Sequence, residues 1–365
     1  MGEELYAEII DPDKYGRACR VYGPVGSHED LLPYLVRRLL ENGANTSFVN
    51  QIFDERIEVE DIVADPIALS RATEFQPHPK IPAPPALFGS ERSNSSGVNL
   101  ADRSVAATLL QEMDQSLENV VSAQPIVSGE YLDGPTLESM NPARRSEIVG
   151  VCKQADRTMV DQAMALAIAA QPEWDRSPAG ERADILLRAA DLYQEHAFEL
   201  LALCVKEAGK TVADAVSELR EAIDFLRYYA VECRTRFSAS VELPGPSGES
   251  NALGLRGRGV FVCISPWNFP LAIFTGQVAA ALAAGNAVLA KPAEQTPLVA
   301  FRATQLLHQA GVPANVLHFL PGDGAEIGGM LSRIAMWPAS HLRVPMRRQR
   351  SSIERSRRGA APSQS

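Results

Sequence analysis

The region that most constrains the fold of this chain is residues 259–324, where short apolar runs alternate with longer helical segments. Val260–Ile264 is a β-branched and apolar run that predicts a buried strand, and a Ser-Pro pair ends it in a loop. Ala287–Ala290 and Asn315–Leu320 predict two further strands. The order strand, helix, strand, helix, strand predicts a nucleotide-binding α/β unit with parallel strands.

Two predicted helices connect these strands. Residues 271–284 are rich in alanine and are followed by a Gly-Asn pair, which is a common helix stop. The second helix is expected to begin at Pro297, with Thr296 as its N-cap, and to end at Gly311.

Polar residues follow the first two of these strands. Asn268 lies on the loop after Ile264, where a side-chain amide can point into a cleft and stabilise a developing oxyanion. Lys291 and Glu294 leave the carboxyl end of the next strand, where such sheets bind ligands, and can hydrogen-bond the hydroxyls of a ribose. An asparagine in a loop is also a common turn former, so Asn268 alone leaves both readings open.

The strings PWNFP and KPAEQTP, at this spacing, resemble the aldehyde dehydrogenase superfamily. The resemblance implies that Asn268 helps to form the oxyanion hole and that Trp267 lines the tunnel for cofactor and substrate. It also implies that Lys291 and Glu294 bind the adenosine ribose of NAD.

The same resemblance extends to a Gly-rich turn but not to a nucleophile. Gly322 and Gly324 match the turn that lets the backbone pass close to the adenine, although this turn is not a G-x-G-x-x-G fingerprint. The family nucleophile is a cysteine downstream of the asparagine, because thiolate attack on an aldehyde gives the intermediate from which hydride leaves. No cysteine follows Cys263, which we assign to the core, and the family's FTGS-like turn and general-base segment are absent. We therefore expect the chain to contain the residues that bind the cofactor but not the nucleophile and the general base.

A second motif lies near the amino end. The helix predicted after Ser27 carries an apolar stripe and a second stripe that includes Tyr34, Arg37 and Arg38. Adjacent arginines are commonly a solvated face, but two guanidinium groups can also clamp one carboxylate.

The segment RVYGPVGSHEDLLPYLVRRLLENGANTSFVN closely resembles the last strand and helix of the proline dehydrogenase barrel in the bifunctional proline utilisation A proteins. The resemblance implies that Arg37 and Arg38 bind the proline carboxylate. It also implies that Tyr22 and Tyr34 lie near the flavin and that Phe48 packs near the FAD adenine. A (β/α)8 barrel needs roughly 250 residues, so we expect no FAD binding or proline oxidation by this chain alone.

The predicted fold class is α/β. It consists of an incomplete aldehyde dehydrogenase-type Rossmann-like domain preceded by the last strand and helix of a proline dehydrogenase (β/α)8 barrel. The predicted segments are a barrel remnant at 1–55, a Pro-rich and then Ser-rich linker with a helix at 56–122, the N-terminal part of an NAD-binding domain at 123–332, and a tail at 333–365.

Helical spacing predicts core helices within 156–169 and 180–207, with Trp174 among the core residues. The helical pattern of residues 206–230 continues past Gly209. Residues 135–151 are expected to form a pair of strands joined by a polar turn.

Composition limits the partners and the location. The net charge of −10 argues against general nucleic-acid affinity for the body of the chain. Five cysteines without a clustered pattern suit a reducing cytoplasm, and the spacing of His196, His308 and His318 suits no metal site. No apolar run is long enough to span a bilayer, and the start lacks a signal peptide.

The tail at 333–365 contains eight Arg, no Lys and one acidic residue. Such a run can be an arm that binds nucleic acid. We favour a shifted reading frame in a high-GC gene, because the family resemblance stops near Leu331 and Arg- and Ser-rich sequence without Lys is typical of such a shift. The tail is predicted to be disordered.

Two functional hypotheses follow. The resemblance implies an enzyme that oxidises L-glutamate γ-semialdehyde to glutamate with NAD in proline catabolism, coupled in the full protein to FAD-dependent proline oxidation. It also implies a small-molecule substrate and a homo-oligomer. The alternative is a catalytically inactive fragment with at most weak dinucleotide binding. A remnant of another aldehyde dehydrogenase is the remaining alternative, although it does not explain Arg37 and Arg38.

Overall fold

The computed structural model describes residues 3–16, 31, 58–72, 74–76, 82–117, 121–245, 247, 250–334 and 340–342. The chain divides into two units, Met1–Ile81 and Pro82–Ser365. The helices described in the first unit are α1 (Glu3–Ile10), α4 (Val59–Ile62) and α5 (Pro66–Ala72). The strand and helix predicted from the resemblance to proline dehydrogenase lie outside the described residues, apart from Leu31.

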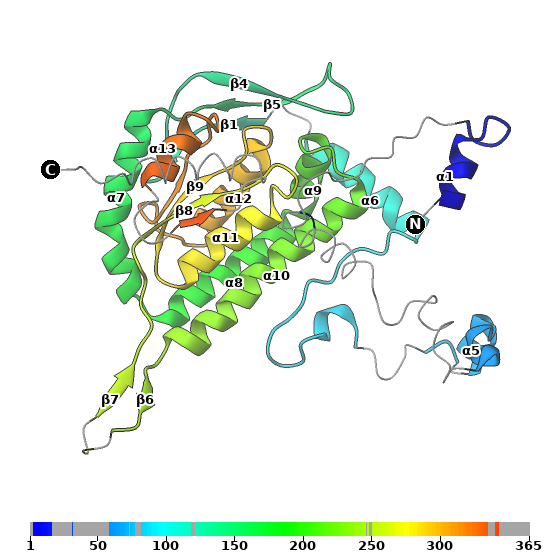
Figure 1. The fold of residues 1–365 in the computed structure, drawn as a ribbon, viewed down its shortest axis with the longest axis horizontal. Coiled ribbons are helices and arrows are strands. Elements are labelled where there is room, and N and C mark those ends of the chain that lie inside the picture. Colours follow the sequence, from blue (N-terminus) through cyan, green and yellow to red (C-terminus); the bar gives the residue numbers. More distant parts are fainter. Residues whose placement is uncertain are drawn as a thin grey trace. The chain divides into compact units, whose positions relative to one another are not determined.

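The second unit is built on a sheet whose described strands run in the order β11-β8-β9-β10-β2-β3 (Figure 1). The strands are β2 (Ile126–Val127), β3 (Glu130–Tyr131), β8 (Val260–Ile264), β9 (Ala287–Lys291), β10 (Leu317–Phe319) and β11 (Ser340–Leu342). Strands β8, β9 and β10 are parallel, as the sequence predicts, whereas β2 is antiparallel to β10.

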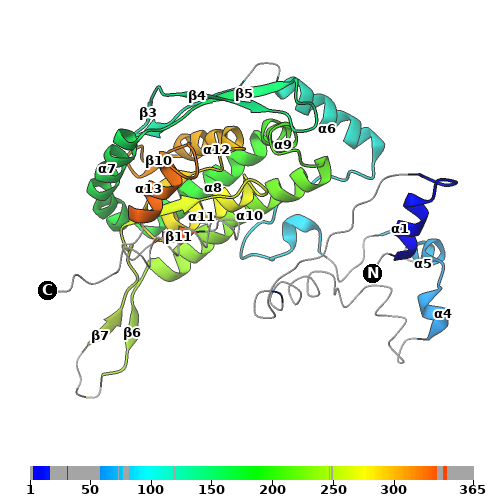
Figure 2. The same ribbon diagram turned by 45° about the horizontal axis from the view of Figure 1, so that its top comes forward.

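Helices cover both faces of this sheet (Figures 1 and 2). The helices are α7 (Arg157–Arg176), α8 (Ala179–Glu195), α9 (Ala197–Lys206), α10 (Val212–Phe237), α11 (Ala272–Ala283), α12 (Pro297–Gln309) and α13 (Ile327–Ile334). Helix α11 is buried on almost every side, because it lies between the sheet and the layer formed by α8 and α10. A helix in that position needs an apolar surface all round, which explains its Ala-rich sequence.

Smaller elements flank the main sheet. β1 (Val121–Ala123), β5 (Ile148–Lys153) and β4 (Thr136–Met140) form a second sheet in that order, and β4 pairs antiparallel with β5. The strand pair predicted at 135–151 is therefore confirmed. β6 (Val241–Leu243) and β7 (Asn251–Leu253) form a hairpin that projects from the body of the second unit (Figure 1).

Part of the predicted linker, from Pro82 onward, belongs to the second unit. It contains the short 3-10 helix η1 (Pro84–Ala86) and α6 (Arg103–Ser116). Between them, the Ser95 backbone N–H and hydroxyl donate to the two carboxylate oxygens of Asp224 on α10 at 2.8 and 2.7 Å. This extended segment is thus fixed by polar contacts to a helix.

The helical pattern predicted to continue past Gly209 is interrupted there. Helix α9 ends at Lys206, and Gly209 has a φ of +68°, which ends a right-handed helix. Helix α10 then begins anew, with the Thr211 hydroxyl accepting a hydrogen bond from the Asp214 N–H at 3.1 Å. The single helical pattern therefore describes two helices.

The tail also differs from its prediction at three residues. Ser340–Leu342 form β11, which pairs in parallel with β8. The free edge of β8 offers unpaired backbone groups, and an edge of this kind accepts a further strand. The predicted disorder is therefore wrong for these three residues, and 335–339 and 343–365 lie outside the described residues.

Helical spacing predicts six core residues. Four of them are buried, namely Trp174, Leu186, Ala190 and Leu200, whereas Leu187 and Leu192 are half-buried and pack against the core. His318 on β10 is also fully buried, and burial lowers its pKa to about 4. Its Nδ1 accepts from the Ser128 N–H at 3.1 Å, so Nε2 carries the proton and donates to the Asn315 carbonyl at 3.1 Å. His318 is thus a neutral side chain with a structural role, as predicted. In the described part of the chain, no helix combines the length and apolarity needed to cross a membrane.

Candidate cofactor site

The candidate site begins where the loops after β8 and β9 leave the sheet side by side. Ile264 is in register with Lys291, and the Ser265 N–H donates to the Lys291 carbonyl at 3.1 Å. Parallel strands present their carboxyl ends at one edge of a sheet, and ligands bind there in open α/β folds. The sequence prediction that Asn268 and Lys291 belong to neighbouring loops agrees with this geometry.

The loop that carries Asn268 is exposed at its tip and anchored at both ends. Trp267 is 51% exposed, and Asn268 is also exposed, whereas Pro266 and Pro270 are buried. The Asn268 amide is therefore accessible to a ligand at the carboxyl edge of the sheet.

A buried ion pair lies beneath this loop. Glu218 on α10 accepts hydrogen bonds from the backbone N–H groups of Leu271 and Ala272 at 2.8 and 3.1 Å. The Lys210 ammonium lies 2.7 Å from the other Glu218 oxygen and 4.3 Å from the centre of the Phe269 ring. The pair thus fixes both the start of α11 and one aromatic residue of the loop.

The second loop brings Lys291 and Glu294 to the segment that follows β10. Lys291 is 2% exposed and donates from Nζ to the Pro292 carbonyl at 2.9 Å. Its aliphatic stem lies against Gly328, where an added Cβ would be 3.5 Å from Lys291 Cε. One carboxylate oxygen of Glu294 accepts from the Gly324 N–H at 2.6 Å.

The Gly-rich turn between β10 and α13 is closely packed. A Cβ added to Gly322 would lie 2.6 Å from Cγ1 of Ile327, so a larger residue would displace the start of α13. The Asp323 carboxylate accepts from the N–H groups of Ala325 and Glu326 at 2.6 and 3.0 Å, which holds the turn in place. The close contact with Ile327 is the reason for glycine at position 322. Backbone conformation is not, because the φ of Gly322 lies outside the left-handed region.

The start of α12 differs from the sequence prediction in its capping group. Thr296 precedes the helix, but its side chain makes no capping hydrogen bond and its buried hydroxyl has no partner among the described residues. Glu207 takes this role instead, because its two carboxyl oxygens accept from the N–H groups of Leu298 and Val299 at 2.7 and 3.0 Å. The Thr296 cap is thus replaced by a residue 91 positions away from Leu298.

Glu207 is an unusual acid. Burial raises its pKa to about 8, although the hydrogen bonds from Leu298, Val299 and Ser139 act in the opposite direction. Glu207 and Glu218 were both absent from the residues that the sequence singled out. The sequence did hold one sign that Glu218 is buried. It falls among Ala215, Leu219 and Ala222, which form the buried stripe of α10.

The described cysteines do not form a reactive centre. Cys152, Cys204, Cys233 and Cys263 are free and buried. Burial raises the pKa of each thiol, to about 12 for Cys152 and Cys263. A thiol of that kind is protonated at neutral pH and is a poor nucleophile. Within the described residues, no group of three or more His, Cys, Asp or Glu side chains could hold a metal ion.

The predicted proline-site residues cannot be placed, since Tyr22, Tyr34, Arg37, Arg38 and Phe48 lie outside the described residues. The other predicted site residues divide into two groups. The structure brings Glu294 into contact with Gly324 and packs Lys291 against the helix that follows. Trp267 and Asn268 lie on the neighbouring loop.

Comparisons with known proteins agree with both halves of the sequence. Residues 131–336 match the aldehyde dehydrogenase family, and residues 1–51 match proline dehydrogenase. The chain is 46% identical to the bifunctional protein PutA of Escherichia coli (strain K12), over 91% of this chain and 25% of that protein. It is 42% identical to a 1-pyrroline-5-carboxylate dehydrogenase of Anoxybacillus flavithermus, over 56% of this chain and 40% of that protein.

Solved structures give the same picture. A crystal structure of a bifunctional proline utilization A protein matches with a TM-score of 0.59 and 46% identity, over 91% of this chain and 30% of that one. The 1-pyrroline-5-carboxylate dehydrogenase from Thermus with bound NAD matches with a TM-score of 0.61 and 34% identity, over 66% of this chain and 47% of that one. The chain therefore spans only about a quarter of the PutA relative from Escherichia coli.

Proposed function

Because this chain belongs to the aldehyde dehydrogenase family, we propose that its second unit forms the dinucleotide-binding half of an L-glutamate γ-semialdehyde dehydrogenase. The observation that carries the proposal is the cluster at the carboxyl edge of the sheet, where Glu294 contacts Gly324 and Lys291 packs against Gly328. A carboxylate acceptor and an ammonium donor at this edge suit the two hydroxyls of a ribose.

These residues fit the adenosine half of NAD. Glu294 accepts hydrogen bonds from ribose hydroxyls, Lys291 donates to them, and the backbone at Gly322 and Gly324 allows close approach of the adenine. NAD supplies the hydride acceptor when it is bound. Asn268 donates its amide N–H to the oxygen of the aldehyde as negative charge develops there.

The identity of the aldehyde substrate, L-glutamate γ-semialdehyde, is proposed from the names of the relatives. Several are 1-pyrroline-5-carboxylate dehydrogenases, and hydrolysis of 1-pyrroline-5-carboxylate gives glutamate γ-semialdehyde. The match of residues 1–51 to proline dehydrogenase supports the same substrate, because proline oxidation yields 1-pyrroline-5-carboxylate. The reaction product is glutamate.

A second candidate function is dinucleotide binding without oxidation of an aldehyde. The four cysteines among the described residues favour it, because each of these thiols has a raised pKa and none lies on the loops of the candidate site. Under this proposal the chain binds NAD and does not reduce it unless another segment supplies the nucleophile.

The test separates binding from chemistry. NAD binding to the purified chain is measured by isothermal titration calorimetry, and NADH formation from glutamate γ-semialdehyde is measured by absorbance. Glu294→Ala is expected to weaken NAD binding about tenfold, which corresponds to one lost charge-assisted hydrogen bond. Glu195→Ala, an exposed change on α8, serves as the matched control.

The outcomes are distinct. NADH formation that is abolished by Asn268→Ala supports the enzymatic function and refutes the inactive alternative. Binding without NADH formation supports dinucleotide binding alone. Failure of the folded chain to bind NAD refutes both.

Three further properties are proposed on the same basis. We infer a cytoplasmic location, supported by the free described cysteines, and a homo-oligomer, to be tested by light scattering. We also infer that residues 1–55 do not bind FAD on their own, because a complete (β/α)8 barrel needs roughly 250 residues. A flavin absorbance spectrum in the purified protein would contradict the last inference.

A further inference from the structure

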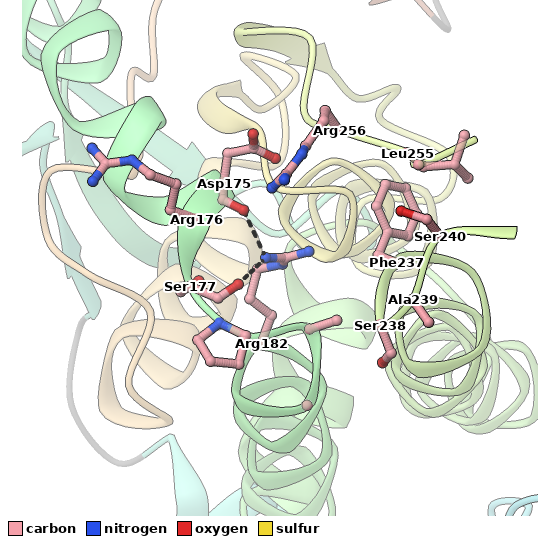
Figure 3. A pocket seen from close by; sticks show the side chains of 14 residues that line it. Asp175, Arg176, Ser177, Arg182, Phe237, Ser238, Ala239, Ser240, Leu255 and Arg256 are labelled. Carbon is pink, nitrogen blue, oxygen red and sulfur yellow. Dashed lines mark hydrogen bonds between the residues drawn. The ribbon is translucent and has the colours of Figure 1, made fainter. Parts of the chain in front are cut away.

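A cavity of about 350 Å³ lies between the α7–α8 turn, the end of α10 and the segment after β7 (Figure 3). Its lining includes Asp175, Ser177, Arg182, Ser240 and Arg256. Ligand cavities in proteins range from about 300 to 1,000 Å³, so this one suits a small molecule.

The cavity lies at the opposite edge of the sheet from the candidate cofactor site. Arg182 Nε donates to the carbonyl of Ala283, the last residue of α11, at 3.1 Å. The Gly257 N–H, shortly before β8, donates to Asp175 Oδ1 at 2.6 Å. Since α11 runs from the carboxyl end of β8 back to the amino end of β9, the cavity is at the amino ends of these strands.

The central residue of the cavity carries a buried positive charge. Arg182 is 3% exposed, and its hydrogen bonds run to the backbone carbonyls of Ala283, Trp174, Asp175 and Ser177. Among the ion pairs of the described residues, none includes Arg182, although Arg234 nearby pairs with Asp184. A buried charge that lacks an opposite charge is costly.

The lining contains one carboxylate, that of Asp175, against the three guanidinium groups of Arg176, Arg182 and Arg256. The Cys233 thiol hydrogen-bonds the Ala179 carbonyl at 3.3 Å, and burial raises its pKa despite the opposing effect of Arg182. The thiol is therefore neutral at pH 7. The Asp175 carboxylate forms no ion pair within the described residues and is held by the Gly257 N–H.

Two more features favour an anion. Figure 3 shows the guanidinium of Arg256 directed toward the same space as that of Arg182. Helix α8 begins at the cavity wall with Pro178 as its N-cap, which makes no side-chain capping hydrogen bond. The positive end of a helix and two guanidinium groups thus border one cavity.

We propose that this cavity is a binding site for a small oxyanion, a carboxylate or a phosphate group, held between Arg182 and Arg256 at the start of α8. The planar guanidinium groups match the paired oxygens of such an anion. The bound anion neutralises Arg182, so binding stabilises the folded chain.

The experiment uses the full purified chain and two probes, inorganic phosphate and glutarate, titrated by calorimetry at constant ionic strength with chloride as the balancing anion. We expect saturable binding of at least one probe. Arg256→Gln should weaken it about tenfold, which corresponds to about 1.4 kcal/mol. Arg256 is exposed, so this change leaves the fold intact.

Arg176→Gln is the matched control, because Arg176 borders the cavity but points away from it in Figure 3 and donates from Nε to the Pro172 carbonyl at 2.9 Å. It removes the same charge and should leave binding unchanged. Binding of phosphate alone identifies a phosphate ligand, and binding of glutarate alone identifies a carboxylate; both support the site.

Two results overturn the proposal. One is the absence of saturable binding of either probe to the folded chain. The other is an equal loss of affinity in the Arg176→Gln and Arg256→Gln variants, which indicates a general charge effect. Glu294→Ala should not change oxyanion affinity, so this result is separate from the outcome for NAD binding.

Discussion

Two strand–loop–helix connections at the carboxyl edge of the sheet are each held by a buried glutamate, and among the described residues only one of the two glutamates pairs with a cation. At the start of α11, Glu218 accepts from two backbone N–H groups and pairs with the Lys210 ammonium at 2.7 Å. At the start of α12, Glu207 also accepts from two backbone N–H groups, one on each of its oxygens. Among the described ion pairs, Glu218 has a cation and Glu207 has none.

The difference shows that a neighbouring lysine changes the way in which a buried glutamate caps a helix. Without a cation, burial raises the pKa of Glu207 to about 8, so the acid is mostly protonated at pH 7. With a cation, Glu218 contributes a compensated charge beneath the Asn268 loop. The two caps should therefore respond differently to substitution and to pH.

The largest expected effect is that of Glu218→Ala. The change leaves the Lys210 ammonium unpaired in a mostly buried position and frees two backbone N–H groups. We expect the free energy of unfolding in urea to fall by about 3–5 kcal/mol, as for other broken buried pairs. The exposed control Glu195→Ala should change it by less than about 0.5 kcal/mol.

Removing the cation should have a slightly smaller effect. Lys210→Met leaves Glu218 buried without its partner and is expected to cost about 2–4 kcal/mol. The double variant Lys210→Met with Glu218→Gln should recover part of this loss, because no buried charge then remains. Additive losses in urea unfolding would show that the pair does not act as a unit.

The pH dependence should distinguish the second cap. The pKa of Glu207 rises from an ordinary value of 4.5 to about 8 on folding, so the unfolded chain releases this proton at a pH where the folded chain retains it. The contribution of Glu207 to the free energy of unfolding therefore falls as the pH rises from 4.5 to about 8.

Glu207→Gln tests this sign. Glutamine imitates the protonated acid, so below about pH 4.5 the unfolding free energy of the variant should differ from that of the unmodified chain by only about 1 kcal/mol. As the pH rises towards 8, the variant should become the more stable of the two, because it has no proton that unfolding releases. The variant should also lose the downward trend with pH that the unmodified chain shows. Urea unfolding at several pH values would refute a protonated Glu207 if both chains gave parallel curves.

The smallest expected effect is at Thr296. Its hydroxyl is buried without a partner, so Thr296→Val should change the unfolding free energy by less than about 0.5 kcal/mol. Thr211→Val is the matched control, because the Thr211 hydroxyl does cap α10, and it should cost about 1 kcal/mol. Equal losses in thermal unfolding would show that Thr296 caps its helix after all.

Local pattern accounts for what the sequence could predict. The apolar run at β8, the Gly-Asn stop after α11 and the Pro at the start of α12 each act over a few residues, so the order of elements and the edge that carries Lys291 follow from them. The roles proposed for Lys291, Glu294 and Asn268 stay predictions that the binding experiments test.

Tertiary contacts account for what the sequence could not predict. The cap of α11 comes from Glu218, 53 residues before Leu271, and the cap of α12 comes from Glu207, 91 residues before Leu298. The threonine before α12 satisfied the local capping rule, but the distant carboxyl group occupies the N–H groups that it would have bound. Gly209 likewise broke a helical pattern that looked continuous.

The buried His318 and Glu207 exchange protons with solvent in opposite directions when the second unit unfolds. Folding holds the imidazole neutral, with a pKa of about 4 against an ordinary 6.5, and holds the acid protonated to about pH 8. Unfolding therefore makes the histidine take up a proton and the glutamate release one. Between pH 4.5 and 6.5 the two exchanges cancel, so for these two groups the heat of unfolding is independent of the buffer in that range. It depends on the buffer just below and just above that range, where only one of the two groups exchanges a proton.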